Sequence, residues 1–131
     1  SLMPWIFLRD VTAWDRWHAM FPSPANAMIL CLGCTESAGL CAVERIERWR
    51  TRIRAVHVRN VHGSFAERSH KDVRLDCGSL DLPPVFDQLR KVNFQGSIIP
   101  EHFPEFPCEQ GLLVSKAFAL GYCRAMMQRR D

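Results

Sequence analysis

The chain has 131 residues, of which 47% are hydrophobic and 24% are charged. This balance excludes the low hydrophobicity and high charge of a disordered segment, and the length suits one domain. The formal net charge is +3, and six arginines lie between residues 45 and 59, but Glu44 and Glu47 interrupt them. We therefore expect a solvated helix face here and no nucleic-acid partner.

The cysteines and the apolar stretches bear on the cellular setting. The six cysteines are unevenly spaced, and no secretory signal pattern is found, so we expect a reduced, cytoplasmic compartment. Every apolar stretch is shorter than the roughly 20 residues of a membrane span, so we expect no membrane partner. Because an apolar run begins almost at once, at Trp5, we expect that an upstream part of the protein is missing.

The first predicted elements are a strand over residues 5–8 and a helix that Thr12 caps. This helix has apolar residues at helical spacing, namely Trp14, Trp17 and Met20. The Pro-Ser-Pro sequence at 22–24 ends it. The unbroken apolar run from Ala27 to Leu32 is typical of a strand that is buried on both faces.

Residues 33–39 are predicted to form a loop, and a second helix follows with an apolar stripe of Leu40, Val43, Ile46 and Trp49. The next strand covers residues 55–58. A long polar loop from residue 59 to residue 79 leads to a third helix, which Asp81 caps and which carries Phe86 and Leu89.

The last strand is predicted over residues 96–99, and a loop over residues 100–107 follows it. A final helix, from about residue 112 to residue 129, is predicted to be amphipathic through Leu113, Ala117 and Leu120. Strands and helices thus alternate in about four units. This order predicts an α/β fold with a parallel sheet and helices packed outside it, either doubly wound or closed as a barrel.

Three consecutive predicted strands end in residues that can carry chemistry. Cys31 ends one strand, His57 the next, and the pair Glu101-His102 follows the last. Functional groups of parallel α/β folds collect at this end of the strands, and a thiolate, an imidazole and a carboxylate together suit a divalent transition metal. Each residue also has a structural interpretation: a core cysteine, a core histidine and exposed loop polar residues.

Other polar residues lie beside these strand ends. Arg59 shares a strand face with His57 by the period of two, so it can bind a substrate carboxylate or form an outer salt bridge. Glu67 and His70 lie in the long loop, which has the length of a functional lid. Cys31 and Cys34 match a CxxC pattern, but the expected loop at 33–39 argues against a thioredoxin-like motif, which opens a helix directly after its strand.

Several short segments of the chain are distinctive when taken together and in this order: PWIF at 4–7, PSPAN at 22–26, CLG at 31–33, VHVRNV at 56–61, GSF at 63–65, LDL at 80–82, IIPEH at 98–102 and ALGY at 119–122. Together they resemble the D-mannonate dehydratase family. The resemblance implies the C-terminal half of a (βα)8 TIM barrel of the xylose-isomerase-like type. Residues 1–131 would then be a single partial domain of about four strands and four helices.

The resemblance also implies a function. The family dehydrates D-mannonate to 2-keto-3-deoxy-D-gluconate in hexuronate breakdown, with Mn²⁺, Fe²⁺ or another divalent metal. By motif, the metal ligands would be Cys31, His57 and Glu101, where Glu101 stands in place of the usual aspartate. His102 would do acid-base work together with Glu101, and the sugar-acid substrate would meet Arg59, Asn60, Glu67 and His70.

Two alternatives remain open. One is a sugar isomerase or epimerase of the same barrel superfamily, although Cys31 argues against it. The other is a non-catalytic half-barrel that associates with itself or with a missing half. Four strands taken from a closed barrel leave two open edges and an unfilled interior. We therefore expect a homo-oligomer or a complex with the missing half, and no active monomer.

Overall fold

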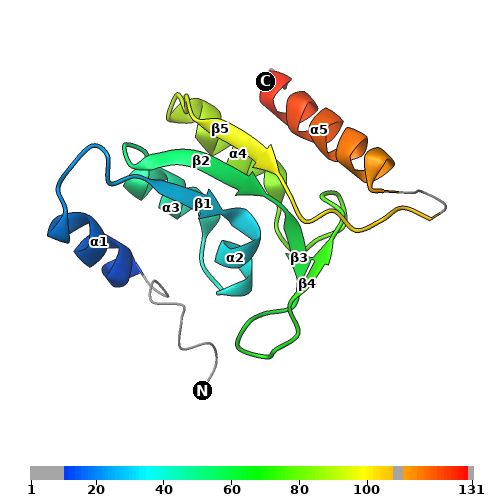
Figure 1. The fold of residues 1–131 in the computed structure, drawn as a ribbon, viewed down its shortest axis with the longest axis horizontal. Helices are drawn as coiled ribbons and strands as arrows, with labels where there is room; N and C mark the ends of the chain where they lie inside the picture. The colour runs from blue at the N-terminus through cyan, green and yellow to red at the C-terminus, as the bar shows by residue number, and fades with distance from the viewer. Residues whose placement is uncertain (1–10, 108–110, 130–131) are drawn as a thin grey trace.

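The computed structural model of the chain describes residues 11–107 and 111–129. The strand expected at 5–8 lies outside the described residues. In chain order (Figure 1), the elements are α1 (Val11–Met20), β1 (Met28–Cys31), α2 (Leu32–Ser37), α3 (Ala42–Trp49), β2 (Ile53–Val58), β3 (Asn60–His62), β4 (Lys71–Val73), α4 (Leu82–Lys91), β5 (Ser97–Pro100) and α5 (Leu113–Gln128).

The central sheet has the strand order β1-β2-β5, and both pairings are parallel. Strands expected at 27–32, 55–58 and 96–99 are therefore confirmed, as is the parallel α/β arrangement. Helix α3 packs against α4, and α4 against α5, so one face of the sheet is covered, as Figure 1 shows with α3 and α4 behind the strands. The register pairs Cys31 with His57 and Val58 with Pro100, which places the carboxyl ends of the three strands side by side.

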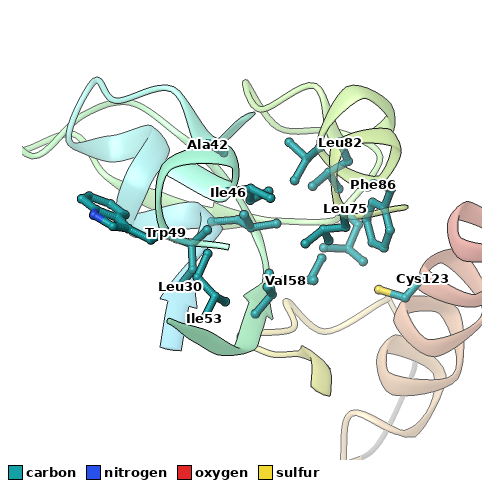
Figure 2. Packing of buried hydrophobic residues seen from close by; sticks show 14 of the residues in the cluster. Leu30, Ala42, Ile46, Trp49, Ile53, Val58, Leu75, Leu82, Phe86 and Cys123 are labelled. Carbon is teal, nitrogen blue, oxygen red and sulfur yellow. The ribbon is translucent and has the colours of Figure 1, made fainter. Parts of the chain in front are cut away.

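The hydrophobic core lies between the sheet and these helices. Figure 2 shows side chains from β1, β2, α3 and α4 meeting there, including Leu30, Ile46, Val58 and Phe86. Removing a large side chain such as Phe86 from water stabilises the fold by about 1.5–3 kcal/mol relative to leaving it exposed. The sulfur of Cys123 reaches this core from α5.

Helix α1 docks on α3 through one of its predicted apolar residues. The rings of Trp14 and Trp49 lie 5.9 Å apart, and the indole of Trp49 donates a hydrogen bond of 3.0 Å to Asp15. The helix expected from the spacing of Trp14, Trp17 and Met20 is thus present, with Trp17 and Met20 on its exposed side. The indole of Trp17 donates a hydrogen bond to the side chain of Asn26, at 2.9 Å.

Two stretches that we expected to be loops contain regular structure. Residues 32–37 form the short helix α2, and the hairpin of β3 and β4 lies within the expected loop at 59–79. The third helix begins after Asp81 as expected, but Asp81 makes no side-chain capping bond. These short elements depend on contacts with the rest of the fold, which local periodicity does not reveal.

The buried face of α5 differs from the predicted one. The helix buries its small residues Ser115, Ala119 and Cys123, whereas Leu113 and Leu120 are exposed. Small side chains let α5 approach α4 and β5 closely. None of the described helices is long and apolar enough to cross a membrane.

Part of the arginine run supports the framework. Arg45 is buried, with its guanidinium 5.0 Å from the centre of the Trp49 ring, so it does not share the expected solvated face. Arg48 pairs with Asp15 of α1 on the exposed side of α3. Arg52 donates hydrogen bonds to the backbone that leads into β1. These contacts give several of the arginines structural partners within the chain.

A buried histidine gives the fold a pH-dependent stability. The His18 ring stacks on Trp14, and among the described residues neither of its nitrogens has a hydrogen-bond partner. Burial lowers the pKa of His18 below its ordinary value of 6.5, Arg52 lowers it further, and Asp15 opposes the shift. The unfolded chain therefore binds the proton more readily, so stability is lost as the pH falls below about 6.5.

We expect the free energy of unfolding to decline between about pH 7 and pH 5, and to decline less steeply in the variant His18→Phe, which cannot be protonated. Urea denaturation at a series of pH values measures both slopes. His62→Gln provides a matched control, because it replaces the same residue type at an exposed position away from His18. Equal slopes for the original chain and His18→Phe would contradict this assignment.

Candidate active site

Three of the predicted site residues meet at the ends of β1, β2 and β5. The His57 Nδ1 lies 2.9 Å from one carboxylate oxygen of Glu101, and the Cys31 thiol lies 3.7 Å from the other. The backbone N–H of Glu101 donates to the carbonyl of Val58 at 3.1 Å, which fixes the carboxylate at the strand end. The structure thus brings together the thiol, the imidazole and the carboxylate whose proximity we expected.

His102 follows Glu101 and pairs with a different residue, Asp72. The backbone of His102 is left-handed, with a φ of 52°, and its side chain is 52% exposed. The Nδ1 lies 3.3 Å from a carboxylate oxygen of Asp72 on β4. A carboxylate at this distance can orient an imidazole, so His102 is positioned as an accessible proton donor or acceptor.

Arg59 is buried beneath these groups and bonded on three sides. Its Nε donates to Cys31 Sγ at 3.3 Å, its Nη2 to Cys34 Sγ at 2.9 Å, and its Nη1 to Asp72 at 2.8 Å. The Nε also lies 3.7 Å from Glu101. The salt bridge of Arg59 is therefore an internal one, and its contact with a substrate carboxylate stays a prediction.

Gly33 leaves the space that Arg59 occupies. A Cβ atom at position 33 would lie 2.6 Å from the Arg59 side-chain carbon Cγ and 2.9 Å from its Nε. Both distances are shorter than real contacts, so the guanidinium crosses the start of α2 only because residue 33 has no side chain. This packing gives a physical reason for the glycine in the Cys-Leu-Gly segment.

Cys34 is a further member of the site, and the sequence reasoning gave it no role. Helix α2 opens directly after β1 with Cys31 as its N-cap, and the Cys34 backbone N–H donates to Cys31 Sγ at 3.4 Å. Our expectation that a loop separates the CxxC pattern from a helix is therefore wrong. A hydrogen bond from Cys31 lowers the pKa of Cys34 to about 6, against the effect of burial and with help from Arg59. The same bond raises the pKa of Cys31, and burial raises it further.

Asp72 is the second residue that the sequence reasoning missed. It pairs with Arg59 and His102 and lies 3.9 Å from His70 Nε2, so it links three of the predicted site residues. Its position depends on the β3–β4 hairpin, which pairs Val61 with Asp72. The strand has only three residues, Lys-Asp-Val, and shows no alternation of polar and apolar residues, so no local pattern indicates it.

The two predicted loop residues occupy different places. His70 shares a hydrogen bond of 2.5 Å with Ser37 at the end of α2, and its ring lies 4.9 Å from that of Phe65. Burial lowers the pKa of His70. Glu67 is exposed, and its carboxylate accepts a hydrogen bond from Ser69 within the same loop. His70 is therefore connected to the site by its contact with Asp72. Glu67 is an exposed residue of the loop.

Asn60 lies at the base of the hairpin and is only 1% exposed. Its amide donates to the carbonyls of Leu75 and Leu80, at 2.8 and 2.9 Å. Its oxygen accepts from the backbone N–H groups of Val61 and Leu80, at 2.9 and 3.0 Å. Asn60 thus ties the returning loop to β3, and its predicted contact with substrate stays a prediction.

The chemical types of the side chains at the strand ends fit a divalent metal. Their positions do not yet form a complete ligand set. Sulfur from Cys31, nitrogen from His57 and oxygen from Glu101 are ligands that manganese, iron or zinc accepts in proteins. Within residues 11–107 and 111–129, however, no three His, Cys, Asp or Glu side chains are already arranged to hold a metal ion. Glu101, which contacts both other donors, is the residue around which these groups are gathered.

Comparisons of the sequence find relatives among known proteins. The mannonate dehydratase of Geobacillus thermodenitrificans is 34% identical over 90 residues, which cover 63% of this chain and 24% of that protein. The mannonate dehydratase of Oceanobacillus iheyensis is 32% identical over 102 residues, 72% of this chain and 28% of that protein. The Escherichia coli protein named as L-ribulose-5-phosphate 3-epimerase SgbU is 24% identical over 119 residues, 89% of this chain and 42% of that protein.

The fold also matches a solved structure. The crystal structure of mannonate dehydratase from Streptococcus suis serotype 2 superposes with a TM-score of 0.78 at 22% identity, and covers 89% of this chain and 36% of that chain. The parallel β1-β2-β5 sheet with its helices is thus part of a TIM-barrel-like fold. The chain spans less than half the length of each of these relatives. Residues 6–127 match the family described as D-mannonate dehydratase (UxuA), and the chain belongs to that family.

Proposed function

We propose that this chain supplies the C-terminal half-barrel of a divalent metal-dependent hydro-lyase. The enzyme would convert D-mannonate into 2-keto-3-deoxy-D-gluconate, in cytoplasmic hexuronate breakdown, with Mn²⁺ or Fe²⁺ as its metal. One observation carries the proposal: the Glu101 carboxylate touches both His57 and Cys31 at adjacent strand ends. Family membership supports the dehydratase chemistry.

The reaction removes a proton next to the substrate carboxylate and protonates a leaving hydroxyl group. Cys31, His57 and Glu101 would hold the metal, which supplies a positive charge that stabilises negative charge developing on the substrate. His102 is accessible and faces Asp72, so it would transfer a proton at its exposed ring nitrogen. Arg59, which is bonded to Cys31, would keep that thiol in place beside the substrate.

The test joins this chain to the barrel half that its relatives possess. We expect a chimera with the N-terminal half of the Geobacillus thermodenitrificans mannonate dehydratase to form 2-keto acid from D-mannonate when Mn²⁺ is present. The variant His102→Ala of the chimera should lose at least about a hundredfold in kcat, because general acid-base groups contribute 10²–10⁴-fold. A folded chimera that binds Mn²⁺ and leaves D-mannonate unchanged would overturn the proposal.

The second candidate is a sugar epimerase, which the similarity to the Escherichia coli protein supports. Epimerisation also removes a proton from carbon, but it returns a proton to the same atom and expels no hydroxyl group. The same chimera incubated with L-ribulose 5-phosphate in D₂O separates the two reactions. Deuterium incorporation with retention of all oxygen atoms would favour the epimerase, and formation of a 2-keto-3-deoxy acid from D-mannonate would favour the hydro-lyase.

We further propose that the open face of the sheet is covered by additional barrel units or by a second copy of the chain. Ile29 of β1 is 53% exposed and Ile99 of β5 is 39% exposed, on the face opposite α3 and α4. Parallel sheets are almost always covered on both faces. Size-exclusion chromatography with light scattering is expected to find that the chain self-associates, and a monodisperse monomer would contradict this.

The exposed isoleucines provide a specific variant for that measurement. We expect Ile29→Lys combined with Ile99→Lys to shift the chain toward monomer with its circular dichroism unchanged, because two buried charges oppose association. Gln95→Lys is a matched control, since Gln95 is exposed in the turn before β5. Equal self-association of both variants would show that the contact lies elsewhere.

A further inference from the structure

The pair Cys31 and Cys34 has features that the metal site does not require. Both residues are half-buried, and their side chains stand at the N-cap and third positions of α2, which face each other. The backbone N–H of Cys34 donates to Cys31 Sγ, and the two thiols are hydrogen-bonded to each other. The other described cysteines are Cys41, which precedes α3, Cys77, which lies in a loop, and Cys123, which lies in α5.

A single guanidinium group holds the two sulfur atoms next to each other. Arg59 donates from Nε to Cys31 and from Nη2 to Cys34, and these two nitrogens belong to one rigid plane. The Arg59 side chain can lie across the start of α2 because Gly33 has no Cβ atom to block it. Of the two cysteines, the proposed metal site uses only Cys31.

We propose that Cys31 and Cys34 form a reversible disulfide, and that this bond removes Cys31 from the metal site. The second half of this statement rests on the proposed function, and the first half does not. The strand-to-helix position of the pair is the arrangement in which a CxxC sequence closes a small ring. A sulfur that is bonded to another sulfur has no thiolate to offer a metal.

The reaction needs a co-reactant, which is a low-molecular-weight disulfide such as oxidised glutathione. The thiolate of one cysteine attacks a sulfur of that disulfide, forms a mixed disulfide and releases one glutathione thiolate. The second cysteine loses its proton and attacks the protein sulfur of the mixed disulfide. This step forms the Cys31–Cys34 bond and releases the second glutathione, so two thiols are oxidised while one disulfide is reduced.

The test incubates the chain with oxidised glutathione, blocks the remaining thiols by alkylation and maps the peptides by mass spectrometry. We expect one peptide to contain Cys31 and Cys34 linked to each other, with the loss of two hydrogens and no glutathione. Dithiothreitol should restore both thiols. Stable glutathione adducts on either residue, or free alkylated thiols at both, would overturn the proposal.

Two variants and a metal measurement complete the experiment. Cys34→Ser should abolish the linked peptide and leave a glutathione adduct on Cys31, whereas Cys41→Ser, at an exposed cysteine outside the pair, should not affect the link. Mn²⁺ binding should fall at least about tenfold on oxidation and recover on reduction, both in the original chain and in Cys41→Ser. A mapped disulfide together with unchanged Mn²⁺ affinity would overturn the metal half of the proposal and would also count against Cys31 as a ligand. Failure of D-mannonate turnover alone would bear on the proposed function only.

Discussion

Replacing Cys31 or His57 with alanine is expected to weaken the binding of Mn²⁺ at least about a hundredfold, because changes even to the outer partners of a metal ligand cost 10- to 100-fold. Each substitution removes one of the donors that the structure gathers around Glu101. Equilibrium dialysis followed by metal analysis measures the affinity of each variant directly.

Matched controls are available in the same chain. Cys41 and His62 are the same residue types at exposed positions, so Cys41→Ala and His62→Ala should bind Mn²⁺ as the original chain does. If Cys31→Ala and His57→Ala also retain full affinity, these residues have only packing and hydrogen-bonding roles. Circular dichroism of each variant separates loss of the metal from loss of the fold.

The variant Asn60→Ala is expected to lose on the order of 4 kcal/mol of stability, because a buried polar group left unsatisfied costs about 1–3 kcal/mol and several are left here. The affected groups are the backbone amides of Val61 and Leu80 and the carbonyls of Leu75 and Leu80. Urea denaturation measures the loss. We also expect faster hydrogen exchange over residues 74–80, which the Asn60 side chain holds against β3.

A control for this variant is the exposed Asn93, whose backbone is left-handed with a φ of 52°. Glycine tolerates that conformation, so Asn93→Gly should change the free energy of unfolding by less than about 0.5 kcal/mol. A loss below about 1 kcal/mol for Asn60→Ala would contradict the structural role that the hydrogen bonds give to this residue.

The elements that were predicted correctly have strong local signals. The strand at Met28–Cys31 is an unbroken apolar run, and α4 has a proline-rich start with Phe86 and Leu89 at helical spacing. Parallel strands end at one edge of a sheet, so the three predicted strands were enough to predict that Cys31, His57 and Glu101 lie close together. The candidate cluster therefore followed from strand order alone.

The parts that were predicted wrongly depend on tertiary contacts. Helix α2 has six residues with little apolar periodicity, and it forms where Cys31 caps it and Arg59 lies across Gly33. The hairpin strands have three residues each. For α5 we expected the large apolar residues to form the buried face. The helix instead buries the small residues Ser115 and Ala119, and the larger Leu113 and Leu120 are exposed.

Asp72 and Cys34 show the same limit within the site. Asp72 reaches Arg59 and His102 only because the hairpin folds back on itself, and no spacing rule connects these positions. Cys34 is part of a CxxC pattern in the sequence, but whether the two cysteines lie close together depends on whether a helix or a loop follows β1. The structure has the helix α2 there.

Anomalous diffraction at the manganese edge, from crystals of the chain grown with Mn²⁺, locates the metal and its ligands. We expect a single strong peak at the ends of β1, β2 and β5, within bonding distance of Cys31 Sγ, a nitrogen of His57 and a carboxylate oxygen of Glu101. A fully ordered strand-end cluster with no peak, or a peak bound only by other residues, would contradict the assignment of these three side chains as metal ligands.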